Sequence, residues 1–78
     1  SINNTSGLAG IAYWINDYYE LPEEHRVDKR EEIVAKVKAM VDAEYESGRN
    51  SVMGDDELDN LVRLADKKRH KEFLVYGK

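Results

Sequence analysis

The sequence contains no cysteine, one proline and five glycines among its 78 residues. Without cysteine the chain forms neither a disulfide framework nor a thiolate metal site. Its first residues lack the basic and apolar pattern of a secretory signal, and its longest apolar runs are far shorter than the ~20 residues of a membrane span. These absences predict a cytoplasmic chain with no membrane contact.

Positive charge is also scarce. The chain has 12 Lys and Arg against 16 Asp and Glu, a net charge of −4, which argues against a general nucleic-acid binder because phosphates attract basic surfaces. The content of 41% hydrophobic residues is too high for a disordered tail. The length allows one domain, and because a domain of this size has a small core, a partner would stabilise it.

The clearest helical pattern runs over residues 28–47. Asp28 and Glu31 fit a capping box at its start, and Gly48 stands where a left-handed residue ends a helix. The apolar residues recur at spacings of three and four and therefore share one face. They are Ile33, Val34, Val37, Met40, Val41 and Tyr45. This segment is the best-defined element of the sequence.

Two further helices are expected on either side of it, at residues 7–19 and at residues 55–72 or longer. Gly54 is the expected N-cap of the later helix, which starts with acidic residues and has the basic run Lys67–Lys71 in its later turns, as the helix dipole favours. Residues 1–6 are expected to form a flexible lead-in. The sequence thus predicts an all-α fold, a small three-helix arrangement with short connections, in one domain over residues 7–76.

Several side chains form a candidate interaction surface. Trp14 lies at the edge of the apolar stripe of helix 7–19, and Tyr13 lies outside it. Trp14 either covers the rim of the core or docks with Tyr13 on a partner, since aromatic anchors concentrate at interfaces. A stripe of small side chains, on the far side of helix 28–47, either only favours the helix or lets a second surface approach closely. It consists of Ala35, Ala39 and Ala43.

Groups that support catalysis or metal binding are sparse. His25 and His70 lie far apart in the sequence, without the spacing of a metal motif, and no serine has the setting of a nucleophile. His25 is flanked by Glu24 and Arg26 in a connection, where it is either an inert surface residue or acts on a neighbouring site. We therefore expect no metal site, no cofactor site and no catalysis by this chain alone.

One stretch has an order of residues typical of a known family. The residues are TSGLAGIAYWIN at 5–16, DK at 28–29, VAK at 34–36 and EYESGR at 44–49. Together they resemble the helical region after the catalytic barrel of 2-isopropylmalate synthase and homocitrate synthase, acyltransferases of amino-acid biosynthesis, over roughly residues 5–64. The resemblance implies a parent enzyme that condenses acetyl-CoA with a 2-oxo acid, using a divalent metal held in a TIM barrel. The metal ligands of that barrel have no counterpart here.

The resemblance also implies a role for the segment. In this family the helices beyond the barrel pack on a second protomer and help to close its active site, and His25 and Tyr45 are candidates, by residue type, for a contribution there. The first hypothesis is therefore a non-catalytic accessory and dimerisation segment, bound to a second copy or to the missing barrel. The alternative is a free-standing three-helix module that binds a protein partner. In a less expected version of this alternative, the module binds nucleic acid through Lys67–Lys71. A third possibility is that the helices pack separately on a larger protein.

Overall fold

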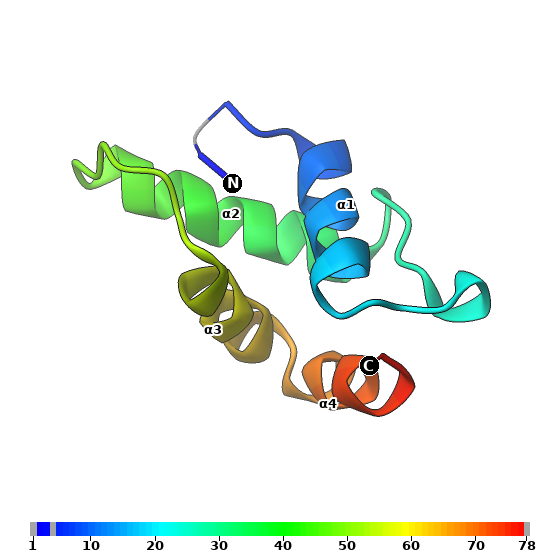
Figure 1. The fold of residues 1–78 in the computed structure, drawn as a ribbon. Helices are drawn as coiled ribbons and strands as arrows, with labels where there is room; N and C mark the ends of the chain where they lie inside the picture. Colours follow the sequence, from blue (N-terminus) through cyan, green and yellow to red (C-terminus); the bar gives the residue numbers. More distant parts are fainter. Residues whose placement is uncertain (1, 4, 78) are drawn as a thin grey trace.

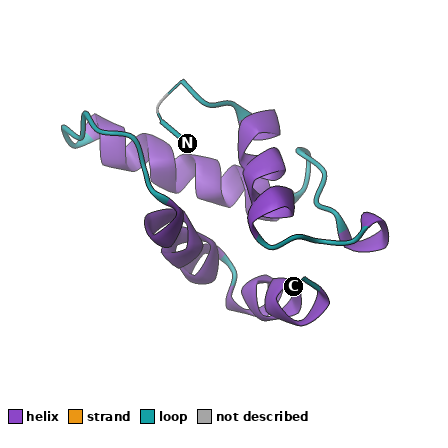
Figure 2. Cartoon of the chain, viewed as in Figure 1, coloured by secondary structure: helices purple, strands orange, loops and turns teal. Residues whose placement is uncertain are grey.

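The computed structural model of the chain describes residues 2–3 and 5–77 and is all-helical (Figure 1). It contains four α-helices and one short 3-10 helix: α1 (Leu8–Tyr18), η1 (Glu23–His25), α2 (Glu32–Glu46), α3 (Asp55–Ala65) and α4 (Lys67–Tyr76). Figure 2 shows loops between the helices and no strand in the described part of the chain. The predicted all-α class is confirmed, whereas the predicted number of three helices is wrong.

The fourth helix arises because the chain breaks at Asp66. Its backbone is extended there, with φ −160° and ψ 96°, and its N–H donates to the carbonyl oxygen of Val62 at the end of α3. Its side chain accepts from the backbone N–H of Arg69 at 3.1 Å and so caps α4. Aspartate is among the best N-cap residues because its carboxylate satisfies a free amide of the first turn. Asp66 therefore ends one helix and begins another.

The break moves the basic run Lys67–Lys71 from the end of a helix to its beginning. These residues occupy the first turns of α4, where the helix dipole disfavours positive charge. The expectation that the run complements the dipole at a C-terminus is therefore wrong.

Helix α2 lies at the centre and packs against both α1 and α3, while α4 packs against α3. The predicted apolar face of α2 forms much of the core, with a smaller share for Met40 and Tyr45, which are only half-buried. Each fully buried side chain of this kind stabilises the fold by about 1.5–3 kcal/mol. The largest fully buried side chains are Ile11, Ile15, Ile33, Val34, Val37, Val41, Leu58 and Val62.

The two ends of α2 differ in how well they agree with the helix ends predicted from the sequence. At the start, the backbone N–H of Asp28 donates to the Glu31 carboxylate at 2.8 Å, but the Asp28 carboxylate accepts from Arg30 two residues on. The pair therefore forms a turn ahead of the helix, which begins at Glu32. At the end, Gly48 has φ +110°, a conformation that glycine adopts without strain, and its N–H donates to the carbonyl oxygen of Tyr45. The predicted left-handed ending is confirmed.

The segment before α1 contacts the body of the protein. Ile2 is buried, and the backbone N–H of Met53 donates to its carbonyl oxygen at 2.8 Å in an isolated antiparallel bridge. Gly54 is the N-cap of α3, as predicted. Within residues 2–3 and 5–77, each helix is either too short or too polar to cross a bilayer.

Candidate functional site

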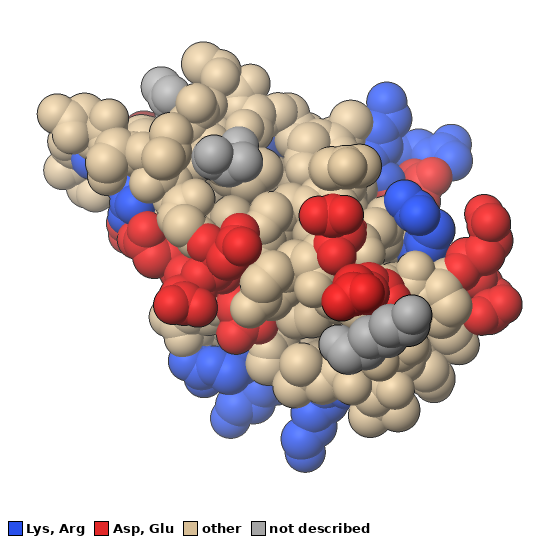
Figure 3. Space-filling model, viewed as in Figure 1, with Lys and Arg blue, Asp and Glu red and all other residues tan. Residues whose placement is uncertain are grey.

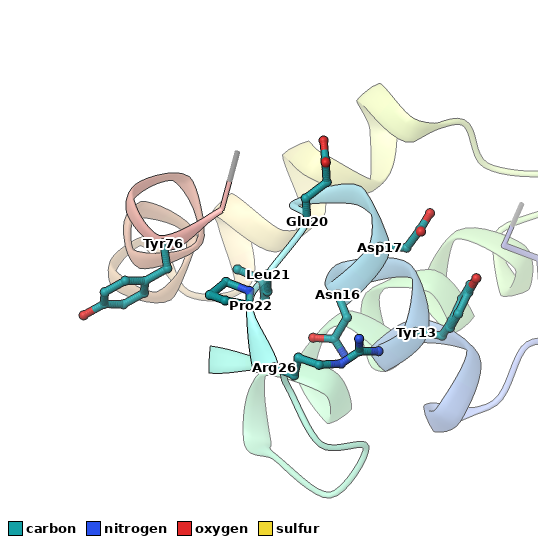
Figure 4. Close-up of a pocket in the computed structure, with 8 residues that line it drawn as sticks. All are labelled: Tyr13, Asn16, Asp17, Glu20, Leu21, Pro22, Arg26 and Tyr76. Atoms are coloured by element: carbon teal, nitrogen blue, oxygen red, sulfur yellow. The ribbon is translucent and has the colours of Figure 1, made fainter. Parts of the chain in front are cut away.

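A pocket of about 520 Å³ lies between the second half of α1, the connection that follows it and the end of α4 (Figure 4). Figure 4 shows Tyr13 at one side of this pocket and Tyr76 at the other, with Arg26 between them. Its lining combines aromatic, acidic, amide and guanidinium groups. The lining residues are Tyr13, Asn16, Asp17, Glu20, Leu21, Pro22, Arg26 and Tyr76.

Asn16 holds in place the segment that contributes Arg26 to the pocket. Its Nδ2 donates to the carbonyl oxygen of Val27 at 2.9 Å, and its Oδ1 accepts from the backbone N–H of Val27 at 2.6 Å. Asn16 is buried, so these two bonds are shielded from water. The side chain of one helix residue therefore holds the backbone next to Arg26 in place.

The rest of the connection is shaped by two contacts. Glu20 follows α1 with φ 51°, a left-handed conformation that costs a non-glycine residue free energy. The backbone N–H of Leu21 donates to the carbonyl oxygen of Asn16 at 3.0 Å and completes the turn. His25 then stacks on Tyr76, with ring centroids 3.7 Å apart and planes inclined by 6°. The stack joins the turn that carries His25 to α4.

Of the two aromatic residues predicted to dock, only Tyr13 is on the surface, with 65% of its area exposed. Trp14 is 8% exposed, stacks on Tyr18 at 4.7 Å and donates from Nε1 to the Asp55 carboxylate at 2.9 Å. Trp14 therefore packs in the core and satisfies its N–H inside the chain, as buried tryptophans commonly do.

The alanine stripe lies on the outer face of α2, because Ala35, Ala39 and Ala43 are all exposed. Tyr45 is half-buried, and its hydroxyl donates to the carbonyl oxygen of Ser51 at 2.5 Å. The turn that carries His25 and the C-terminal end of α2, which carries Tyr45, lie at opposite ends of the molecule (Figure 1). A single copy of the chain therefore does not bring His25 and Tyr45 into one site.

A second polar cluster joins three helical segments. The Asp59 carboxylate on α3 accepts from the Tyr19 hydroxyl, after α1, at 2.5 Å and lies 2.9 Å from Nε2 of His70 on α4. Burial alone would raise the pKa of Asp59, but the hydrogen bonds from Tyr19 and His70 outweigh it and keep this pKa below its ordinary value. Burial, with the adjacent Asp59 carboxylate, raises the pKa of Tyr19.

Sequence analysis missed this cluster because its members are far apart in the chain. Asp59 was part of an acidic helix start and His70 part of a basic run, and both are ordinary surface patterns. In the structure Asp59 is only partly buried, next to the fully buried Leu58. The partners of Asp59 are set only by the packing of α4.

The stability of the fold is expected to decrease in acid. The pKa of Asp59 is lower in the folded chain than in the unfolded chain, so its charge stabilises the fold above about pH 4, and this contribution disappears as the pH falls through the folded pKa. Glu57 acts in the same direction, because Arg49 and the N–H of Gly54 lower its pKa to about 2. Urea unfolding between pH 7 and pH 2 measures the effect.

The variant Asp59→Asn should be less stable than the wild type at pH 7 and should lose less stability between pH 5 and pH 2. Asp56→Asn, at an exposed position of the same helix, is the control and should follow the wild type. An equally steep acid dependence in Asp59→Asn would show that Asp59 does not contribute.

The resemblance implies a divalent metal in the parent enzyme. Within residues 2–3 and 5–77, no three histidine, aspartate or glutamate side chains come together in a group that could hold a metal ion. The side chains of these residues therefore do not form a donor set that fits the ion.

Comparison with known proteins identifies two relatives. The chain is 44% identical over 62 residues to citrate (Re)-synthase of Clostridium kluyveri and 42% identical over 62 residues to citrate (Re)-synthase of Syntrophus aciditrophicus. These matches cover 80% of this chain but only 14% and 10% of the two relatives. No family model matches the chain, and no solved structure matches it. The chain is therefore a homologue of a segment of the citrate (Re)-synthases, and its resemblance to condensing synthases of the 2-isopropylmalate and homocitrate synthase type is confirmed.

Proposed function

We propose that this chain is a non-catalytic helical accessory and dimerisation segment of a citrate (Re)-synthase-like enzyme, which condenses acetyl-CoA with a 2-oxo acid. The observation that carries the proposal is the 44% identity over four-fifths of the chain to a citrate (Re)-synthase. In this proposal the acetyl-CoA and metal sites belong to the rest of the enzyme. The chain packs on a second protomer or on the catalytic body.

The surface of the chain supports this role. Tyr13 is exposed at the pocket on α1, and the alanine stripe is exposed on α2. Aromatic side chains are enriched at protein interfaces, and the distance between two packed helices decreases when the side chains at their contact are small. We propose Tyr13 and the alanine stripe as the packing surfaces.

His25 and Tyr45 are the proposed contributions to a partner active site. The turn that carries His25 and the C-terminal end of α2, which carries Tyr45, lie at opposite ends of the molecule (Figure 1). One active site would therefore receive the two residues from different copies, or would receive only one of them. His25 is the better candidate, because it is exposed and oriented by its stack on Tyr76, whereas the Tyr45 hydroxyl already bonds Ser51.

A chimaera tests the proposal. The matching segment of the Clostridium kluyveri citrate (Re)-synthase is replaced by this chain, and citrate formation and the sedimentation coefficient are compared with those of the parent. We expect both to be retained. Ala39→Arg in the chimaera should weaken assembly about a hundredfold, because an unpaired charge buried at an interface costs about 3 kcal/mol.

Asn50→Arg is the matched control, since it adds the same charge at an exposed position in the loop after α2 and should leave assembly unchanged. His25→Ala should lower citrate formation without changing sedimentation. A chimaera that folds and assembles but responds equally to Ala39→Arg and Asn50→Arg would contradict the packing role of α2.

A further inference from the structure

The outer face of α1 forms a groove of about 370 Å³ with the first residues of the chain and the start of α3. Its residues on α1 recur at spacings of three and four, so they share one face of that helix. The groove combines aromatic and acidic side chains and has no basic side chain among the described residues. The lining residues are Ile2, Ser6, Gly10, Tyr13, Trp14, Asp17, Tyr18 and Asp55.

Negative charge gathers at this groove, which we call the acidic groove. Asp17 on α1 and Asp56 at the start of α3 are exposed, and neither carboxylate forms an ion pair among the described residues. Burial, and then the carboxylates of α3 with Asp59 first, raises the pKa of Tyr18 in the groove. Figure 3 shows Asp and Glu side chains over the region where α1 and α3 lie in the same view. A positively charged surface therefore fits the groove.

Helix α4 carries the opposite charge on its outer face, which we call the basic face. Its five residues are spaced so that they lie on one side of the helix, and all five are exposed. Leu74 and Val75 are 60% and 75% exposed, and the lysines form no ion pair among the described residues. The residues of the basic face are Lys67, Lys68, Lys71, Leu74 and Val75.

The two surfaces complement each other. The aliphatic side chains of the basic face can pack on the exposed rings of Tyr13 and Tyr18 in the acidic groove, which removes apolar area on both sides from water. The ammonium groups of the basic face can then meet the carboxylates of Asp17 and Asp56. Because one chain carries both surfaces, a second copy of it supplies a partner of matching charge and matching apolar content.

We propose that the basic face of one copy of this chain docks in the acidic groove of a second copy. The contact joins two different surfaces, so it is heterologous, and its charges fix the orientation of the two copies. It rests on the proposed function in one respect, since it names a partner for Tyr13. It does not use the alanine stripe or the catalytic body.

Sedimentation velocity of the 78-residue chain tests this contact. At low salt the sedimentation coefficient should rise with protein concentration, and at about 0.5 M NaCl it should rise much less, because salt screens exposed charges. Lys68→Glu/Lys71→Glu and Asp17→Lys/Asp56→Lys should each weaken self-association at least about tenfold, because they place like charges opposite each other. The four positions are exposed, so circular dichroism should show an unchanged fold.

An equimolar mixture of the two double variants should associate again. Lys68→Glu/Lys71→Glu keeps the acidic groove and Asp17→Lys/Asp56→Lys keeps the basic face, so the mixture can form the contact that neither variant forms alone. This recovery also shows that both variants are folded.

Lys29→Glu/Lys36→Glu is the matched control, since it makes the same change in net charge at two exposed positions outside both surfaces and should associate like the wild type. A wild-type chain that stays monomeric at low salt would overturn the proposal, as would a mixture that stays monomeric or an equal loss in the control. Such a result would not affect the proposed accessory role, which Ala39→Arg in the chimaera tests separately.

Discussion

Replacing Phe73 with alanine is expected to destabilise the chain by about 3–5 kcal/mol, the usual cost of removing a buried phenylalanine side chain. Phe73 is the main apolar anchor of α4, with 2% of its area exposed and its ring 5.3 Å from that of Tyr19. The Arg69 guanidinium lies 5.2 Å from the centroid of the Phe73 ring. A domain of this size has little stability to lose, so we expect α4 to detach or the chain to unfold.

Urea unfolding followed by circular dichroism measures this loss. Leu74→Ala is the matched control, because Leu74 is the next residue of α4 and is 60% exposed, so its truncation should change stability by less than about 0.5 kcal/mol. Similar midpoints for Phe73→Ala and Leu74→Ala would show that α4 is not anchored by Phe73. Loss of α4 would also remove the stack of Tyr76 on His25.

Asn16→Ala is expected to cost about 2–4 kcal/mol. The substitution removes the bonds to both the N–H and the carbonyl oxygen of Val27, and each buried backbone group left without a partner costs about 1–3 kcal/mol. Alanine has the higher helix propensity, so the loss cannot come from α1 itself. The fold should become less stable, and the backbone next to Arg26, at the side of the pocket, should become less ordered.

Asp17→Ala serves as the comparison, since Asp17 is exposed on the same helix and should change stability by about 0.5 kcal/mol or less. Asn16→Asp separates the two bonds, because a carboxylate accepts from the Val27 N–H but has no proton for the Val27 carbonyl oxygen. We expect Asn16→Asp to be as destabilising as Asn16→Ala or nearly so. Thermal unfolding that left Asn16→Ala at the midpoint of Asp17→Ala would contradict the role of Asn16.

Local patterns in the sequence were sufficient for the helical class and for several helix ends. The apolar spacing of residues 33–45 identified the face of α2 that forms the core. Gly48 and Gly54 marked a helix end and a helix start that the structure confirms. These features depend on neighbours within one helical turn, and such neighbours are visible in a sequence.

The contacts that form the candidate sites were much harder to predict from the sequence. Tyr13 was correctly placed outside the apolar stripe, but the burial of Trp14 depends on Asp55, which lies on another helix. His25 was identified as a loop residue, whereas its stack on Tyr76 depends on the position of α4. Such contacts join residues that no local pattern links.

The sequence by itself determined an all-helical chain with a well-defined central helix and a relationship to condensing synthases, because periodicity and residue order are local. Only the tertiary structure decided that Asp66 divides the last helix, because the gain from capping α4 depends on where Phe73 packs. The need for glycine at position 77 is also decided by the tertiary structure, since a Cβ there would lie 1.8 Å from the carbonyl oxygen of Tyr19. That close approach brings the end of α4 against the end of α1, while the break at Asp66 places the basic run at a helix start.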